Sequence, residues 1–92
     1  MGGAARIRPE RLPEKLRQIR LALGLSQTEM LKRLGLEEEM QYARISEYET
    51  GQREPSLLTL LEYSRVAGVH MEVLADDDMD LPDKLPVTKR RS

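Results

Sequence analysis

Apolar side chains recur at spacings of three and four residues along the first part of the chain, which is the period of an amphipathic helix. Pro13 stands where a helix tolerates proline, in the first turn, and Gly24 supplies a left-handed end. The pattern therefore predicts a first helix that begins near residue 12, with an apolar face made of Leu12, Leu16, Ile19 and Leu23.

A second, shorter helix is predicted between Ser26 and Gly35. Ser26 and Glu29 have the spacing of a capping box, in which the serine hydroxyl accepts one free backbone N–H and the glutamate carboxylate accepts another. The apolar face of this helix consists of Met30, Leu31 and Leu34.

Three further helices follow. Residues 36–50 are predicted to form the third, because Ile45 and Tyr48 share one face and Gly51 ends the series. Ser56 is a good N-cap for a fourth helix, and a short fifth helix is predicted to end near residue 75.

Glycines at positions 24, 35, 51 and 68 fall where four helices end, and no segment alternates apolar and polar residues as a half-buried strand does. The sequence therefore predicts an all-α domain of five short helices over residues 12–75. Residues 1–11 lack periodicity and are predicted to be a flexible arm. Residues 76–92 combine an acidic run with Pro82 and Pro86 and a basic end, which predicts an irregular tail.

Composition excludes several classes of site. A chain of 92 residues is one small domain, and its 39% of hydrophobic residues can bury a modest core that is largely aliphatic, since Phe and Trp are absent. Without cysteine and with one histidine, neither a disulfide framework nor a Cys- or His-based metal site is expected, and no cofactor is predicted. No apolar stretch approaches the roughly 20 residues of a membrane helix, so we expect a cytoplasmic protein without a membrane segment.

The net charge of −1 is unevenly distributed. Residues 1–24 carry six basic and two acidic groups, or +4, and residues 25–50 carry three against six, or −3. Each of the two remaining segments, 51–75 and 76–92, sums to −1. Positive charge therefore gathers in the first quarter of the chain, and Lys89, Arg90 and Arg91 add a second basic group at the end.

A short second helix between two glycines, followed by a third helix, has the spacing of a helix-turn-helix motif. The sequence then gives, in order, the step Gly24-Leu25-Ser26-Gln27, a run from Ile45 to Ser56 that reads I-S-E-Y-E-T-G-Q-R-E-P-S, and the step Ala67-Gly68-Val69. With these residues the chain resembles the helix-turn-helix domain of phage lambda-type repressors and Cro, the XRE family of bacterial transcriptional regulators. The resemblance covers about residues 12–75 and implies a five-helix, lambda-repressor-like fold with the motif at helices two and three.

The resemblance also implies a set of DNA contacts, namely Gln27, Thr28, Gln41, Tyr42, Ala43, Arg44, Glu47, Thr50, Gln52 and Arg53. The glutamine that begins the second helix would bind a phosphate, the residues from 41 to 47 would face bases, and the last three would touch the DNA backbone. For Arg44, a guanine contact and a pairing with Glu47 remain alternatives. Arg20 and Glu49 match a structural ion pair between the first and third helices.

Two features depart from the family pattern. The interval between Gly35 and Ile45 is about four residues longer than usual, because of an insertion near residues 37–40 that contains three glutamates. Either the turn is a longer loop, or the third helix begins one turn earlier. The second departure is Leu31, a bulky residue where the family usually has a small one.

The function that the resemblance implies is sequence-specific DNA binding by a transcriptional regulator, with a repressor favoured, acting as a homodimer on inverted half-sites. The alternative is a protein-interaction module, or the antitoxin of a toxin–antitoxin pair, in which residues 76–92 fold on a protein partner. Met71 and Val73 are the candidate apolar residues of a dimer surface. No activated nucleophile, metal set or phosphate-binding loop supports an enzyme.

Overall fold

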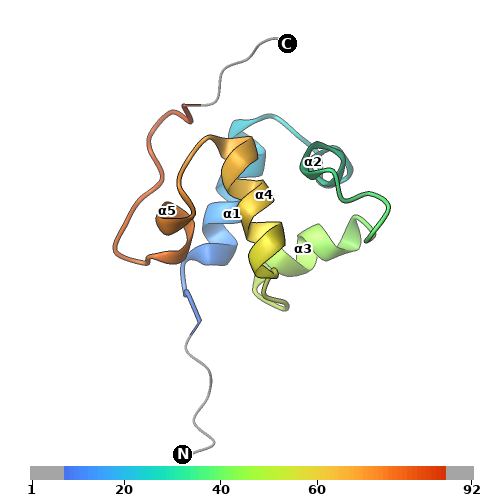
Figure 1. Ribbon diagram of the computed structural model, residues 1–92, viewed down its shortest axis with the longest axis horizontal. Coiled ribbons are helices and arrows are strands. Elements are labelled where there is room, and N and C mark those ends of the chain that lie inside the picture. Colours follow the sequence, from blue (N-terminus) through green and yellow to red (C-terminus); the bar gives the residue numbers. More distant parts are fainter. Residues whose placement is uncertain (1–7, 87–92) are drawn as a thin grey trace, which may run out of the picture.

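The computed structural model describes residues 8–86, which contain five α-helices and no strand (Figure 1). The helices are α1 (Leu12–Ala22), α2 (Gln27–Leu34), α3 (Ala43–Thr50), α4 (Leu57–Ala67) and α5 (Met71–Ala75). The prediction of an all-α fold with five helices is confirmed.

Two helix starts are fixed by serine side chains, as the sequence predicts. At α2 the Ser26 hydroxyl accepts the backbone N–H of Glu29 at 3.1 Å, while the Ser26 N–H donates to the Glu29 carboxylate at 2.8 Å. At α4 the Ser56 hydroxyl accepts the N–H of Thr59 at 3.1 Å. Each cap satisfies backbone groups that a helix end leaves without a partner.

The third helix is shorter than predicted, because α3 begins at Ala43 and residues 36–42 form a loop. Within the loop, the backbone N–H of Met40 donates to the carbonyl of Leu36 at 3.1 Å, which closes a single turn. Leu36 and Met40 pack against the core, and the Tyr48 hydroxyl contacts the Met40 sulfur at 3.7 Å. These two anchors fix the path of the inserted residues and leave the three glutamates at 37–39 exposed. The prediction of a helix from residue 36 is therefore wrong, and the longer loop is the correct alternative.

All five helices contribute to one core. In Figure 1, α1 and α4 lie at the centre of the fold, with α2 and α3 on one side and α5 on the other. Leu31 is buried among the core residues, so the fold accommodates this bulky side chain. The core is aliphatic apart from two tyrosines and consists of Leu12, Leu16, Ile19, Met30, Leu31, Leu34, Ile45, Tyr48, Leu60, Tyr63, Ala67 and Leu74.

The segment after α5 has no regular secondary structure, yet it caps the first helix. The Asp77 carboxylate accepts the backbone N–H groups of Glu10 and Arg11 at 2.9 and 3.0 Å. Arg11, the N-cap residue of α1, has no side-chain cap of its own and pairs with Asp80. Asp77 therefore satisfies N–H groups at the start of α1 from 66 residues away in sequence.

A buried lysine joins α1 to the end of α5. Lys15 is 2% exposed, and its ammonium group donates to the carbonyl oxygens of Val73 at 2.7 Å and Asp76 at 2.8 Å. Burial lowers the pKa of Lys15, and the two carbonyls supply part of the solvation that burial removes. Leu81 and Leu85 also pack against the core, so residues 76–86 extend the folded body along α1.

Residues 1–7 of the expected arm and residues 87–92 of the expected tail, including Lys89, Arg90 and Arg91, lie outside the described residues. Residues 8–11 contact the rest of the fold through the hydrogen bonds to Asp77 and through an Arg8–Glu54 ion pair at 3.9 Å. Among the helices of residues 8–86, none is long and apolar enough to cross a membrane.

We expect Asp77→Asn to lower the midpoint of thermal unfolding at neutral pH. The N–H groups of Arg11 and Glu10 hold the pKa of Asp77 below its usual value. The stabilisation is therefore complete above the unfolded pKa of about 3.9 and is lost as the pH falls through the lower, folded pKa. The difference between the midpoints of wild type and variant should begin to shrink below about pH 4.

The matched control is Asp83→Asn, which removes the same charge from an exposed aspartate of the same segment. Its midpoint should equal that of the wild type across the pH range. Equal midpoints for Asp77→Asn and wild type at pH 7 would contradict the capping role.

Candidate nucleic-acid interface

A two-pronged ion pair joins α1 to α3. The Arg20 Nε atom lies 2.7 Å from Glu49 Oε2, and Arg20 Nη2 lies 3.0 Å from Glu49 Oε1. The two side chains are 13% and 3% exposed. This parallel geometry is the strongest form of arginine–carboxylate contact, and the hydrogen bond to Glu49 raises the pKa of Arg20. The structure thus brings together the two residues that the sequence assigned to a structural pair.

The same pair also holds the start of the helix-turn-helix motif. Arg20 Nη1 donates to the carbonyl of Leu25 at 3.0 Å, in the turn that precedes α2. Gln27, the first residue of α2, is half-buried and directs its amide toward Glu49 Oε1 at 3.5 Å. Arg20 and Glu49 therefore set the position of α2 and α3 relative to α1.

On the outer face of α3, one carboxylate bridges two arginines. Glu47 Oε1 lies 3.4 Å from Arg44 Nε and accepts a hydrogen bond from Arg53 Nε at 3.0 Å. Arg44 and Glu47 are each 36% exposed, and Arg53 is 52% exposed. The bridge holds two guanidinium groups beside each other at the surface of the motif.

A polar series continues from the end of α3 into the following loop. The Thr50 hydroxyl donates to the carbonyl of Ser46 at 3.0 Å, and the Gln52 amide donates to the Thr50 oxygen at 2.9 Å. Thr50, Gln52 and Arg53 are all exposed. These side chains are anchored by local hydrogen bonds and still present polar groups to solvent.

The residues at the start of α3 are exposed to solvent. Gln41, Tyr42 and Ala43 are exposed, with Tyr42 at 58%, and within residues 8–86 the side chains of Gln41 and Tyr42 make no hydrogen bond or ion pair. Tyr42 therefore does not pack into the core. Thr28, in the first turn of α2, is exposed as well. These groups can meet a ligand without first breaking a contact.

The sequence predicts the residues on the outer face of α3 but not all of the contacts between them. The spacing of Arg44 and Glu47 is that of an i, i+3 helix pair, which can be read from sequence. The contact between Glu47 and Arg53 could not be predicted in this way, because the chain turns at Gly51 between them. Gly51 has a φ of 80°, a left-handed value that favours glycine and that reverses the chain after α3.

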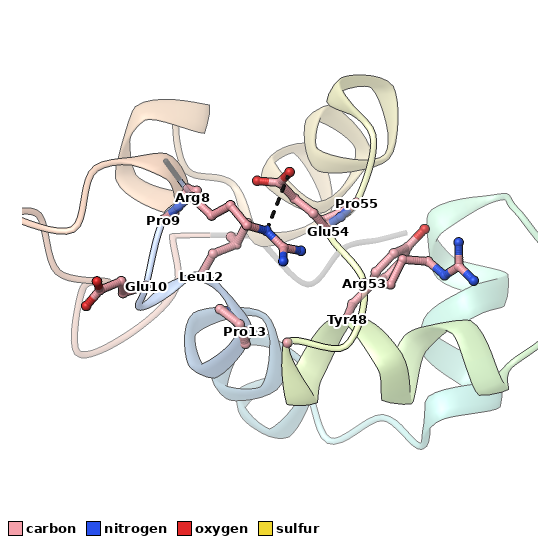
Figure 2. Close-up of a pocket in the computed structure, with 10 residues that line it drawn as sticks. Arg8, Pro9, Glu10, Leu12, Pro13, Tyr48, Arg53, Glu54 and Pro55 are labelled. Atoms are coloured by element: carbon pink, nitrogen blue, oxygen red, sulfur yellow. Dashed lines mark ion pairs between the residues drawn. The ribbon is translucent and has the colours of Figure 1, made fainter. Parts of the chain in front are cut away.

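A small pocket of about 150 Å³ lies between the start of α1 and the loop after α3. Figure 2 shows Arg8 reaching across the pocket toward Glu54, while Arg53 points away over α3. Its floor is apolar and includes Leu12, Pro13 and Tyr48. Pockets that bury small-molecule ligands have volumes of about 300–1,000 Å³. This pocket is therefore too small to suggest an effector site.

The fold and the exposed face of α3 define a helix-turn-helix DNA-binding domain. The helix-turn-helix family profile matches residues 16–74, which is most of the chain, so the chain belongs to the XRE-type helix-turn-helix family. The family is one of DNA-binding regulators, and the resemblance drawn from the sequence is confirmed. Comparison with curated proteins gave no match.

We expect Glu49→Ala to destabilise the fold by about 3–5 kcal/mol, because it removes the carboxylate and leaves the largely buried Arg20 charge with the Leu25 carbonyl as its acceptor. Urea unfolding measures this loss. The double variant Arg20→Met/Glu49→Leu should recover much of it, since apolar residues of similar size can replace a buried pair.

The matched control is Glu62→Ala, which breaks the exposed ion pair between Glu62 and Arg65 on α4. That pair should contribute only about 0–1 kcal/mol. If Glu49→Ala costs no more than Glu62→Ala, the buried pair does not organise the motif.

Proposed function

We propose that the protein is a sequence-specific transcriptional regulator that binds DNA as a homodimer and contacts the major groove with α3. The observation that carries this proposal is the exposed face running from Gln41 to Arg53 on a helix that is fixed from behind by Glu49. A rigid helix with exposed polar and cationic groups fits the major groove, which is about 12 Å wide.

Arg44 is the residue proposed to contact a base. A guanidinium group can donate two hydrogen bonds to the O6 and N7 atoms of guanine. In the free protein Arg44 pairs with Glu47, which is partly exposed. Exposed pairs of this kind contribute about 0–1 kcal/mol, so exchanging the carboxylate for a base edge costs little.

Arg53, Thr50 and Gln52 are proposed to hold the DNA backbone at the end of α3. Gln27 and Thr28 are proposed to do so at the start of α2, where free N–H groups and the helix dipole favour a phosphate. The Ser26 hydroxyl accepts the N–H of Glu29. The N–H groups of Gln27 and Thr28 are therefore left for a phosphate oxygen.

Two copies are proposed to bind inverted half-sites. In such dimers the two recognition helices are about 34 Å apart, one turn of the duplex. The resemblance to phage lambda-type repressors and Cro is the basis for proposing a repressor. A repressor of bacterial DNA works in the cytoplasm, where the sequence also predicts this protein.

A protein-interaction function is the second candidate, and the exposed glutamates at 37–39 favour it. They place negative charge on the loop that leads into α3, close to the proposed DNA face. The antitoxin form of this candidate expects residues 76–92 to fold on a partner. Residues 76–86 instead contact α1 and the core of their own chain, which argues against that form for this part of the tail.

We expect Arg44→Ala and Arg53→Ala to weaken DNA binding in different ways. A duplex is first enriched by selection from a random pool, and binding is then measured by fluorescence anisotropy across salt concentrations. Arg44→Ala should lose about 1–3 kcal/mol on the enriched duplex and relax the preference at one base position. Arg53→Ala should weaken binding to enriched and scrambled duplexes alike and reduce the salt slope by about one.

Arg17→Ala is the control, because Arg17 is an exposed arginine on α1 that belongs to no proposed DNA contact. It should bind as the wild type does. Failure to enrich any sequence, together with weak binding even at low salt, would overturn the regulator proposal and favour a protein partner.

A further inference from the structure

The largest exposed apolar side chains of residues 8–86 include two neighbours at the start of α4. Leu57 is 71% exposed and Leu58 is 73% exposed. Met71 and Val73, the dimer candidates from the sequence, are only half-buried, and Met71 packs against the core. Leu57 and Leu58 therefore offer more apolar surface to another molecule than Met71 and Val73 do, although a dimer surface on α5 stays a prediction from the sequence.

This leucine pair lies beside the proposed DNA-binding face. α4 begins at Leu57, four residues after Arg53 in the loop that follows α3. A molecule that covers Leu57 and Leu58 therefore approaches α3 from its C-terminal end. A second copy packed here through a two-fold axis would bring the C-terminal ends of the two α3 helices toward each other.

The charges around the leucine pair suit a second copy. Leu58, Glu62 and Arg65 follow each other at four and three residues, so they share one stripe of α4. Glu62 and Arg65 pair at 3.3 Å and are 37% and 65% exposed. Because this stripe carries both signs, two copies related by a two-fold axis can meet without like-charge repulsion.

The size of the surface determines when such a contact forms. A stable interface buries about 800 Å² on each partner, which is much more than two leucines provide. Two free copies would therefore separate, whereas two copies held on one duplex have a high effective concentration.

We infer that Leu57 and Leu58 form the contact between two copies of this chain on adjacent DNA half-sites, each pair packing against the same pair of the other copy. This inference rests on the proposed DNA binding. The contact supplies cooperativity, because the second copy gains it only when the first is already bound.

The test compares the enriched inverted-repeat duplex with a duplex that holds a single half-site. Wild type should bind the inverted repeat cooperatively, with a coupling of about tenfold, within the usual range of 5–150-fold. The variant Leu57→Gln/Leu58→Gln should lose the coupling and keep single-half-site affinity within about twofold, a change well below the tenfold coupling. Leu21→Gln, which alters an exposed leucine of α1, is the matched control and should keep the coupling.

Full cooperativity in the folded double variant would overturn the inference, while the proposal of DNA binding would stand.

If wild type binds no duplex, the proposed function fails, and a second measurement tests whether two copies meet at Leu57 and Leu58. The chain has no cysteine, so Leu58→Cys and Leu21→Cys each introduce one thiol. With air as the oxidant, and at protein concentrations high enough to populate the weak contact without DNA, Leu58→Cys should form disulfide-linked dimers at least about tenfold faster than Leu21→Cys. Equal rates would contradict a contact between copies at this surface.

Discussion

The contact between Arg20 and Glu49 is the constraint on which the geometry of the motif depends. It crosses from α1 to α3, and the same guanidinium group also holds the carbonyl of Leu25 in the turn before α2. A buried pair tolerates little displacement, because each lost hydrogen bond leaves a charge without solvation. The outer face of α3 can therefore carry exposed, exchangeable groups such as Arg44 while the helix beneath them stays fixed.

Two segments without regular secondary structure pack against the helices that the Arg20–Glu49 pair joins. The loop of residues 36–42 contains the insertion, and Leu36 and Met40 hold this loop against the core. The segment after α5 closes the other side through Asp77 and the buried Lys15. Both segments lie outside the helices, and both are held by a few specific contacts and not by regular secondary structure.

Local signals in the sequence were sufficient for most of the fold. The capping box at Ser26 and the serine cap at position 56 predict helix starts because their hydrogen bonds span only three residues. The start of α3 could not be predicted in the same way. A turn anchored by Leu36 and Met40 has the same spacing of apolar residues as one turn of helix, so periodicity does not separate the two. Contacts between distant residues, such as Asp77 with Arg11, leave no local pattern at all.

The candidate DNA face was predictable only through the resemblance to the XRE family, since composition alone gives a net charge of −1 and no sign of a nucleic-acid partner. The arrangement of this face in space, with Glu47 between Arg44 and Arg53, could be seen only in the structure.

The most direct test of DNA binding through α3 is a map of amide chemical shifts as the full chain is titrated with the enriched duplex. DNA binding through α3 predicts the largest changes at Gln27, Thr28 and residues 41–53, with α5 and residues 76–86 unchanged. Changes centred on residues 76–86, with α3 unaffected, would contradict it.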